Sequence, residues 1–239
     1  MSPSSSGPGA AERWKQGGRE TVRHWLAPVA HGLARAGVSP DAITLGGLAL
    51  TFVGAIQLSR GRFTEGALWA IAGSVLDALD GPVARERGRE TAFGAFLDST
   101  VDRMSDTLLF LGVAAFYFYR PVLAARTLSG AMESRILGYE PVNDWMVGLS
   151  ALLALAGAYM VSYTRARAEG LGLDCKVGWF ERPERLIVLL GAALLGVGVW
   201  MEYALVLLMI MSWITVVQRV LHVRRRLAGA PPRSGRGAV

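Results

Sequence analysis

The chain has 239 residues, of which 52% are hydrophobic and only 18% are charged, and its formal net charge is +6. A soluble domain of this length normally carries more charge, so the composition indicates a membrane protein. The basic residues stand beside apolar stretches and form no basic stripe interleaved with aromatic residues, which argues against a nucleic-acid-binding protein.

The N-terminal region is predicted to lie outside the membrane core. Residues 1–12 are rich in Ser, Pro, Gly and Ala and are expected to form a disordered tail. Residues 13–36 mix apolar side chains such as Trp25 and Leu26 with Arg19 and Arg23. This pattern predicts an amphipathic helix in the membrane interface, with an ordinary soluble helix as the alternative.

Residues 37–223 are predicted to form one membrane domain of six transmembrane helices. The fold class is therefore an all-α integral membrane protein in which an interfacial amphipathic helix precedes the six spans. Gly61 breaks the first pair of spans, and a tight turn near Glu202 is expected between the last two. Residues 224–239 are basic and rich in Pro and Gly, which predicts a disordered tail or a tether to the lipid surface. The spans are expected near 42–59, 64–84, 92–119, 144–166, 185–200 and 203–222, and a polar stretch at 120–144 separates the third from the fourth.

The distribution of Lys and Arg predicts the orientation, because six spans place both termini on one side. Five basic residues precede the first span, three lie at 85–89, five at 165–185 and six from position 219 onward, nineteen in all, against five on the other side. The positive-inside rule then predicts a multi-pass protein of the cell membrane with both termini in the cytoplasm.

Acidic residues stand where the spans should be apolar. Asp77 and Asp80 lie toward the cytoplasmic end of the second span, and Asp98, Asp102 and Asp106 lie in the first half of the third. Each Asp inside a span costs about 2.5–3.5 kcal/mol on insertion scales, so the group needs a compensating role. Asp77 and Asp80 are three residues apart, and Asp98 and Asp102 are four apart, so each pair is expected on one face of a helix.

The short connection between these two spans predicts antiparallel neighbours whose acidic faces meet. Four carboxylates that close together would repel one another unless cations lay between them. Oxygen ligands suit hard divalent cations, so Mg²⁺ or Mn²⁺ is expected. The alternative is an ion-pair network between these acids and the neighbouring arginines at 85, 87, 89 and 103.

The acidic residues also belong to a longer pattern. Asp77, Asp80, Gly81, Ala84, Arg85, Gly94, Asp98 and Asp102 occupy eight fixed positions within 26 residues. This string resembles the signature of the CDP-alcohol phosphotransferase family. Members transfer a substituted phosphate from a CDP-linked donor, usually CDP-diacylglycerol, to an alcohol and release CMP. The resemblance also implies a homodimer, since members are often dimeric.

The resemblance implies roles for individual residues on the donor side. Asp77, Asp80, Asp98 and Asp102 match the ligands of two metal ions, and Asp102 also matches the catalytic base. Ser39 and Pro40 form an ordinary helix start, with Ser39 as the N-cap, and the same segment matches one that contacts the nucleotide. The residues that match nucleotide-binding positions are Asp41, Thr44, Gly81, Arg85 and Thr91.

The second half of the chain carries the evidence on the acceptor. The strings from Ser162 to Glu169 and from Glu181 to Arg185 are similar to those of the prokaryotic phosphatidylinositol-phosphate synthase branch. In that branch, positions matching Arg165, Arg185 and Arg219, with Ser162 nearby, bind the phosphate of inositol phosphate. An Arg at 165, where the branch usually has Lys, changes the reach and geometry of the side chain.

Two alternatives to this acceptor and this class remain. Glycerol 3-phosphate would suit the same basic pocket, which would make the protein a phosphatidylglycerol-phosphate synthase. A membrane cation transporter would also place acids in spans, but its polar groups should continue through the whole depth of the bilayer. Here they cluster at one end, which favours the enzyme.

Overall fold

The computed structural model describes residues 27–126 and 141–228, apart from Lys176 and Trp179. Helices dominate these residues and no strand occurs among them, which confirms the all-α fold class. The expected tail at 1–12 and most of the predicted interfacial helix lie outside the described residues, although residues 27–35 are helical. The helices are α2 (Pro40–Ser59), α3 (Phe63–Asp77), α4 (Asp80–Glu86), α5 (Ala92–Arg126), α7 (Pro141–Gly170), α8 (Arg182–Leu194) and α9 (Val199–Ala228).

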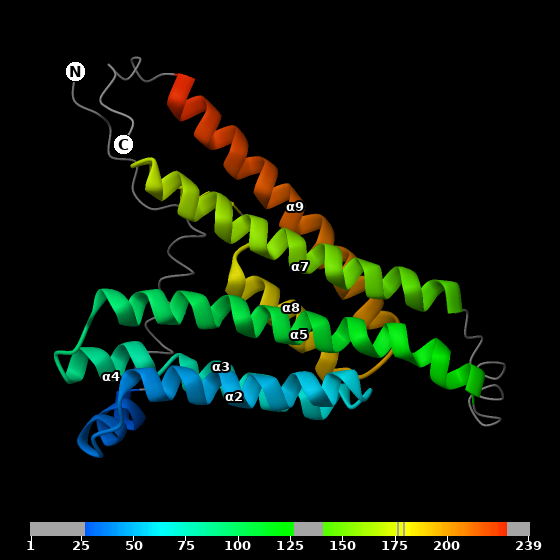
Figure 1. Cartoon of the computed structure of the whole chain (residues 1–239), viewed down its shortest axis with the longest axis horizontal. Coiled ribbons are helices and arrows are strands. Elements are labelled where there is room, and N and C mark those ends of the chain that lie inside the picture. The colour runs from blue at the N-terminus through cyan, green and yellow to red at the C-terminus, as the bar shows by residue number, and fades with distance from the viewer. Residues whose placement is uncertain (1–26, 127–140, 176, 179, 229–239) are drawn as a thin grey trace. The chain divides into compact units, whose positions relative to one another are not determined.

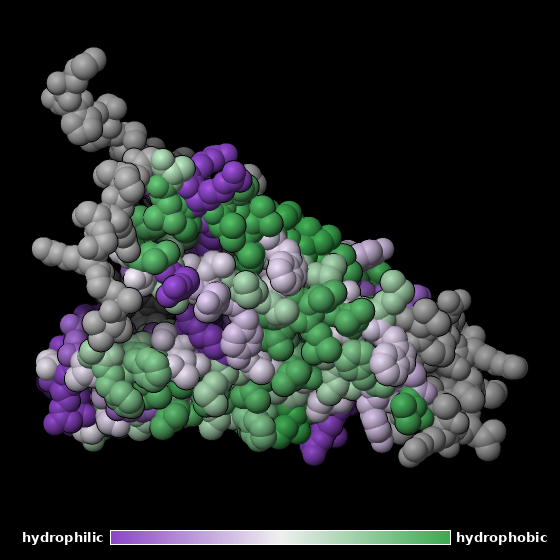
Figure 2. Space-filling view, turned by 45° about the horizontal axis from the view of Figure 1, so that its top comes forward, coloured by the Kyte–Doolittle hydropathy of each residue, from purple (hydrophilic) through white to green (hydrophobic). Residues whose placement is uncertain are grey.

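Four stretches of helix are long and apolar enough to cross a membrane, so the protein is a membrane protein. They are Pro40–Ser59, Phe63–Glu86, Asn143–Gly170 and Val199–Ala228. Helix α8 has 13 residues, fewer than the roughly 20 that a span needs, and α5 carries charged residues in its first half. Most of the face in Figure 2 is apolar, as lipid-exposed helices require.

The chain divides into two compact units. The first unit contains the described residues up to Ala49 together with Ala72–Asp102, and the second contains Leu50–Ile71 and the described residues from Arg103 onward. Buried Ala30, Ile43, Leu79 and Val83 form the apolar core of the first unit. In that unit a Cβ on Gly47 would lie 2.8 Å from the carbonyl oxygen of Gly73, so the backbones of α2 and α3 approach closely there.

The core of the second unit is built around two long helices. Helices α7 and α9 run side by side in Figure 1, and α8 packs against α9. A Cβ on Gly157 of α7 would lie 2.7 Å from the Cβ of Ser212 on α9, so a small residue is needed at this contact. Edge-to-face contact between Phe63 and Phe116, with ring centroids 5.0 Å apart, adds aromatic packing.

Two of the predicted boundaries at the end of the chain are wrong. The turn between α8 and α9 lies at residues 195–198, where Gly196 and Gly198 have φ values of 91° and 147°. Glycine adopts this backbone region without steric cost, whereas Glu202 lies within the first turn of α9. Helix α9 also continues to Ala228, so residues 224–228 are helical and do not belong to the expected tail.

Candidate active site

The helix that carries Asp77 and Asp80 is interrupted between them. The stretch Phe63–Glu86 agrees with the span expected near 64–84, but α3 ends at Asp77 and α4 begins at Asp80, so the expectation that both acids lie on one continuous helix is wrong. Pro82 explains the break, because it has no N–H and its ring clashes with the carbonyl group four residues earlier, that of Ala78. At the third position of α4 a missing N–H costs nothing, since the first turn has no intrahelical acceptors for these groups.

Three of the four predicted metal ligands form a cluster. Asp77, Asp98 and Asp102 are half-buried, and each offers a carboxylate oxygen within 4.8 Å of the others. The ligand oxygens of a divalent cation lie about 2.0–2.6 Å from the metal, so this spacing suits a shared cation after small adjustments. Asp98 and Asp102 lie one turn apart on continuous α5, as their spacing predicted. The residues therefore fit a divalent metal ion.

Asp80 lies outside this cluster and has a different partner. The hydroxyl of Thr44, a residue only 3% exposed, donates a hydrogen bond of 2.6 Å to Asp80 Oδ2. The backbone N–H of Ala42 donates to Ser39 Oγ at 3.2 Å, which confirms Ser39 as the cap of α2. Capping fixes the first turn of α2 and so positions Thr44 against the carboxylate. The role of Asp80 as a metal ligand stays a prediction.

A pocket of the first unit adjoins the carboxylate cluster, because Asp98 belongs to both. Four of the predicted nucleotide-binding residues line this pocket, namely Asp41, Thr44, Gly81 and Thr91. Sequence reasoning missed Arg89 and Glu90, which also line it. Their only signal in the sequence is their position directly before Thr91, which accepts a hydrogen bond from Gly94 N–H at 3.0 Å and so caps α5. The remaining lining residues are Pro40, Asp80, Ala84, Gly94, Ala95 and Asp98.

The fifth predicted nucleotide-binding residue, Arg85, lies beside the pocket. Its Nη1 is 3.9 Å from Glu90 Oε1, and a Cβ built on Gly81 would lie 3.6 Å from the same nitrogen. Arg87, two residues on, donates hydrogen bonds to the carbonyl oxygens of Gly37 at 2.8 Å and Val38 at 2.6 Å. These bonds tie the loop after α4 to the segment before α2, and so hold the walls of the pocket together.

Gly81 gives a test of whether this pocket binds the donor. It is helical, and a Cβ there would meet only the Arg85 guanidinium, at ordinary contact distances of 3.6 and 3.8 Å. Alanine favours a helix over glycine by up to about 1 kcal/mol. We expect Gly81→Ala to leave the unfolding temperature unchanged or raised, and to increase the KM for a CDP-linked donor roughly tenfold because its methyl group enters the pocket.

Gly191→Ala on α8 is the matched control, because a Cβ there would meet no atom within 4 Å in the described structure. This variant should keep the donor KM of the parent. An unchanged donor KM in Gly81→Ala as well would remove Gly81 from the donor site.

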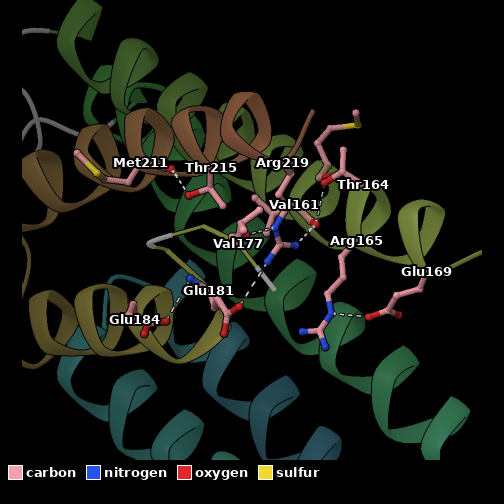
Figure 3. A network of polar contacts seen from close by, with 11 residues as sticks. Val161, Thr164, Arg165, Glu169, Val177, Glu181, Glu184, Met211, Thr215 and Arg219 are labelled. Atoms are coloured by element: carbon pink, nitrogen blue, oxygen red, sulfur yellow. Dashed lines mark hydrogen bonds and ion pairs between the residues drawn. The ribbon is translucent and has the colours of Figure 1, made fainter. Parts of the chain in front are cut away.

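In the second unit, Arg219 holds three segments of the chain together. Its guanidinium is 2% exposed and donates to the carbonyl oxygens of Val177 and Val161, while Nη2 lies 3.5 Å from Glu181 Oε1 (Figure 3). Glu181 in turn caps α8 through a capping box with Glu184. These contacts leave at most one N–H on each Nη atom of Arg219 for a ligand.

Arg185 offers more free donors. It is 3% exposed, and its Nη2 donates to Asp106 Oδ2 at 2.8 Å. Its Nε and Nη1 are buried without a hydrogen-bond partner among the described residues. Leaving a buried donor unpaired costs about 1–3 kcal/mol or more for a charged group, so these two nitrogens mark a place where an acceptor atom is expected.

The other predicted acceptor residues lie on α7. Arg165 is partly exposed and its Nε donates to Glu169 Oε1 at 2.9 Å, as the close view in Figure 3 shows. Ser162 is half-buried one residue after Val161, whose carbonyl Arg219 contacts. Arg165 follows Val161 by four residues, and Arg185 donates its backbone N–H to the Glu181 carbonyl at 3.2 Å. Arg219 contacts Val161 and Glu181, and Arg165 and Arg185 each follow one of these two residues by about one helical turn.

Comparison with known proteins identifies the family. Residues 37–221, most of the chain, match the family model described as CDP-alcohol phosphatidyltransferase. The chain belongs to this family. As a CDP-alcohol phosphatidyltransferase it is an enzyme, a transferase of phospholipid biosynthesis, and the resemblance drawn from the eight-residue signature is confirmed.

Two curated relatives match this chain over most of their own length. The archaetidylinositol phosphate synthase of Methanothermobacter thermautotrophicus is 36% identical over 87% of this chain and 93% of its own. The phosphatidylinositol phosphate synthase of Streptomyces avermitilis is 36% identical over 86% of this chain and 80% of its own.

Solved structures of the phosphatidylinositol phosphate synthase of Mycobacterium tuberculosis are also similar. One has CDP-DAG bound, with a TM-score of 0.69 and 33% identity, and covers 89% of this chain and 98% of its own. Another, in complex with manganese and citrate, has a TM-score of 0.69 and 32% identity over 89% of this chain and 93% of its own. A divalent metal therefore fits both the family and the Asp77, Asp98 and Asp102 cluster.

Proposed function

We propose that this CDP-alcohol phosphatidyltransferase transfers the phosphatidyl group from CDP-diacylglycerol to inositol phosphate. The acceptor hydroxyl oxygen forms a bond to the phosphorus of the phosphatidyl group, the bond from that phosphorus to CMP breaks, and CMP leaves. The products are phosphatidylinositol phosphate and CMP.

The donor nucleotide is proposed to occupy the pocket beside the carboxylate cluster. Support comes from the lining residues, since Asp41, Thr44, Gly81 and Thr91 surround one cavity. Glycine at 81 lets a ligand approach the backbone, and the Arg85 guanidinium beside it suits a phosphate group. A related enzyme with CDP-DAG bound supports the same class of donor.

Asp77, Asp80, Asp98 and Asp102 are proposed to hold two Mg²⁺ or Mn²⁺ ions. When bound, such ions neutralise the charge of a diphosphate and stabilise the leaving group. Asp102 is proposed to accept the proton of the attacking hydroxyl group as its oxygen bonds to phosphorus. A carboxylate suits this task because a second oxygen of the same group remains available to a cation.

The arginine network supports a phosphorylated alcohol as the acceptor. The observation that carries it is buried Arg185, whose Nε and Nη1 have no hydrogen-bond partner in the described part of the chain. Each of these unpaired charged N–H groups can donate to an oxygen of a phosphate group. One relative is named an archaetidylinositol phosphate synthase and another a phosphatidylinositol phosphate synthase. Both names include inositol phosphate, which favours inositol phosphate over glycerol 3-phosphate as the acceptor.

We also propose the membrane topology that the distribution of Lys and Arg in the sequence predicts. Six spans with both termini and the active site on the cytoplasmic side would place nineteen basic residues in the cytoplasm, where CDP-linked donors are made. The helix that includes residues 27–35 would lie in the interface with its exposed side toward the lipid headgroups. A homodimer is proposed from the family resemblance alone.

The experiment that tests the proposed acceptor compares acceptors on one preparation. Purified full-length protein in detergent receives CDP-diacylglycerol, Mg²⁺ and inositol phosphate, glycerol 3-phosphate or free inositol, and CMP release is followed. We expect turnover with inositol phosphate and less than a tenth of that rate with the other two, because free inositol offers Arg185 no phosphate and glycerol 3-phosphate offers no inositol ring. Turnover with glycerol 3-phosphate alone would overturn the acceptor and make the enzyme a phosphatidylglycerol-phosphate synthase.

A further inference from the structure

A buried carboxylate outside the family signature contacts the arginine that we propose for the acceptor. Asp106 follows Asp102 by four residues on α5 and is 6% exposed. Its Oδ2 accepts the 2.8 Å hydrogen bond from Arg185 Nη2, and its Oδ1 lies 3.5 Å from Arg182 Nε. One carboxylate on α5 is therefore shared by two arginines of the first turn of α8.

The contact with Asp106 determines where the rest of the Arg185 guanidinium points. The group is planar and rigid, so a bond at Nη2 restricts the plane in which Nε and Nη1 can donate. These two nitrogens are the ones without a hydrogen-bond partner among the residues that the structure describes. Asp106 thus occupies one donor atom and leaves two others, held in place, for a ligand.

The charges agree with an anion as that ligand. Arg182 and Arg185 both contact the one buried carboxylate of Asp106. A phosphate group at the unpaired nitrogens of Arg185 would meet a guanidinium charge in a setting with little water, where the attraction is stronger than in bulk solvent.

We propose that Asp106 is a positioning residue for the acceptor: it orients Arg185 so that an unpaired N–H group of its guanidinium binds the acceptor phosphate. The proposal rests on the proposed function, because it assigns that phosphate to Arg185. The competing role is an ion pair that only holds α5 against α8. That role would affect folding and not distinguish between the two substrates.

The test is Asp106→Asn, which keeps the size of the side chain and removes its charge. We expect the KM for inositol phosphate to rise about tenfold, while the donor KM and the kcat at saturating acceptor change less than about twofold. Calorimetric titration of the full chain with inositol phosphate alone should show the same loss of affinity without turnover. Asp106→Glu, which keeps the charge but shifts it by one methylene group, should fall between the parent and Asp106→Asn and replaces it if that variant does not fold.

The matched control is Asp144→Asn, which removes another buried carboxylate of the same unit. Asp144 is 2% exposed and its Oδ1 lies 3.6 Å from Arg120 Nη1. This variant should lose stability without any change in the acceptor KM. An equal rise in acceptor KM in both variants would show a general effect of lost ion pairs and overturn the proposal.

A double-mutant cycle separates action through Arg185 from independent action. If Asp106 acts through Arg185, the variant with both Asp106→Asn and Arg185→Gln should have the same acceptor KM as Arg185→Gln alone. Effects that multiply would overturn the proposal. Failure of the proposed function would give a different result, because the parent enzyme would then release CMP with another phosphorylated acceptor. The KM values of the double-mutant cycle would then be measured for that acceptor.

Discussion

Asp102→Asn is expected to lower kcat by about 10²–10⁴-fold, the usual loss when a general base is removed. Asparagine has nearly the same shape as aspartate but cannot accept the proton of the attacking hydroxyl. It also removes one charge from the cluster with Asp77 and Asp98, whose carboxylate oxygens lie within 4.8 Å of one another. The measurement is CMP release by purified protein at saturating CDP-diacylglycerol and acceptor.

Thr100→Ala is the control for this variant on the same helix. Thr100 lies between Asp98 and Asp102 in sequence, and its hydroxyl donates to the carbonyl oxygen of Phe96 at 2.8 Å within α5. We expect its turnover to stay within about twofold of the parent. Turnover close to the parent level in Asp102→Asn would exclude Asp102 as the base.

Removal of divalent metal is expected to have an effect at least as large. A chelator should abolish CMP release, and excess Mg²⁺ or Mn²⁺ should restore it, because the clustered carboxylates repel one another without a cation. Asp77→Asn should raise the metal concentration needed for half-maximal activity at least tenfold. Asp98→Asn should do the same and also raise the donor KM, since Asp98 is the member of the cluster that also lines the pocket in the described part of the chain.

These metal variants can also be followed without turnover. Binding of Mn²⁺ to the full chain, measured by electron paramagnetic resonance, should weaken in Asp77→Asn and Asp98→Asn and stay unchanged in Thr100→Ala. Full activity of the parent enzyme in excess chelator would contradict the metal role of the cluster.

Local spacing was enough to predict part of the site. Asp98 and Asp102 lie one turn apart because α5 is continuous through them, and this depends only on helical geometry. Ser39 was recognised as a cap for the same reason, since the bond to Ala42 N–H joins residues three apart. The break between Asp77 and Asp80 could have been predicted as well, because Pro82 cannot continue a helix through the preceding turn.

Contacts between distant parts of the chain could not be predicted in this way. Thr44 and Asp80 are 36 residues apart, and their hydrogen bond depends on how α2 and α4 pack. The pairing of Asp106 with Arg185 joins residues 79 apart. The use of Arg219 to bind protein carbonyls is also a result of tertiary packing, so a basic residue predicted for the acceptor proved to be largely engaged within the protein.

The most direct test of the central claim is the identity of the lipid product. Purified full-length protein is incubated with CDP-diacylglycerol, Mg²⁺ and inositol phosphate, and the lipids are extracted and analysed by mass spectrometry while CMP is quantified. We predict phosphatidylinositol phosphate and CMP in equal amounts, both lost in Asp102→Asn. CMP release with phosphatidic acid as the only new lipid, or no reaction with this acceptor, would contradict transfer of the phosphatidyl group to inositol phosphate.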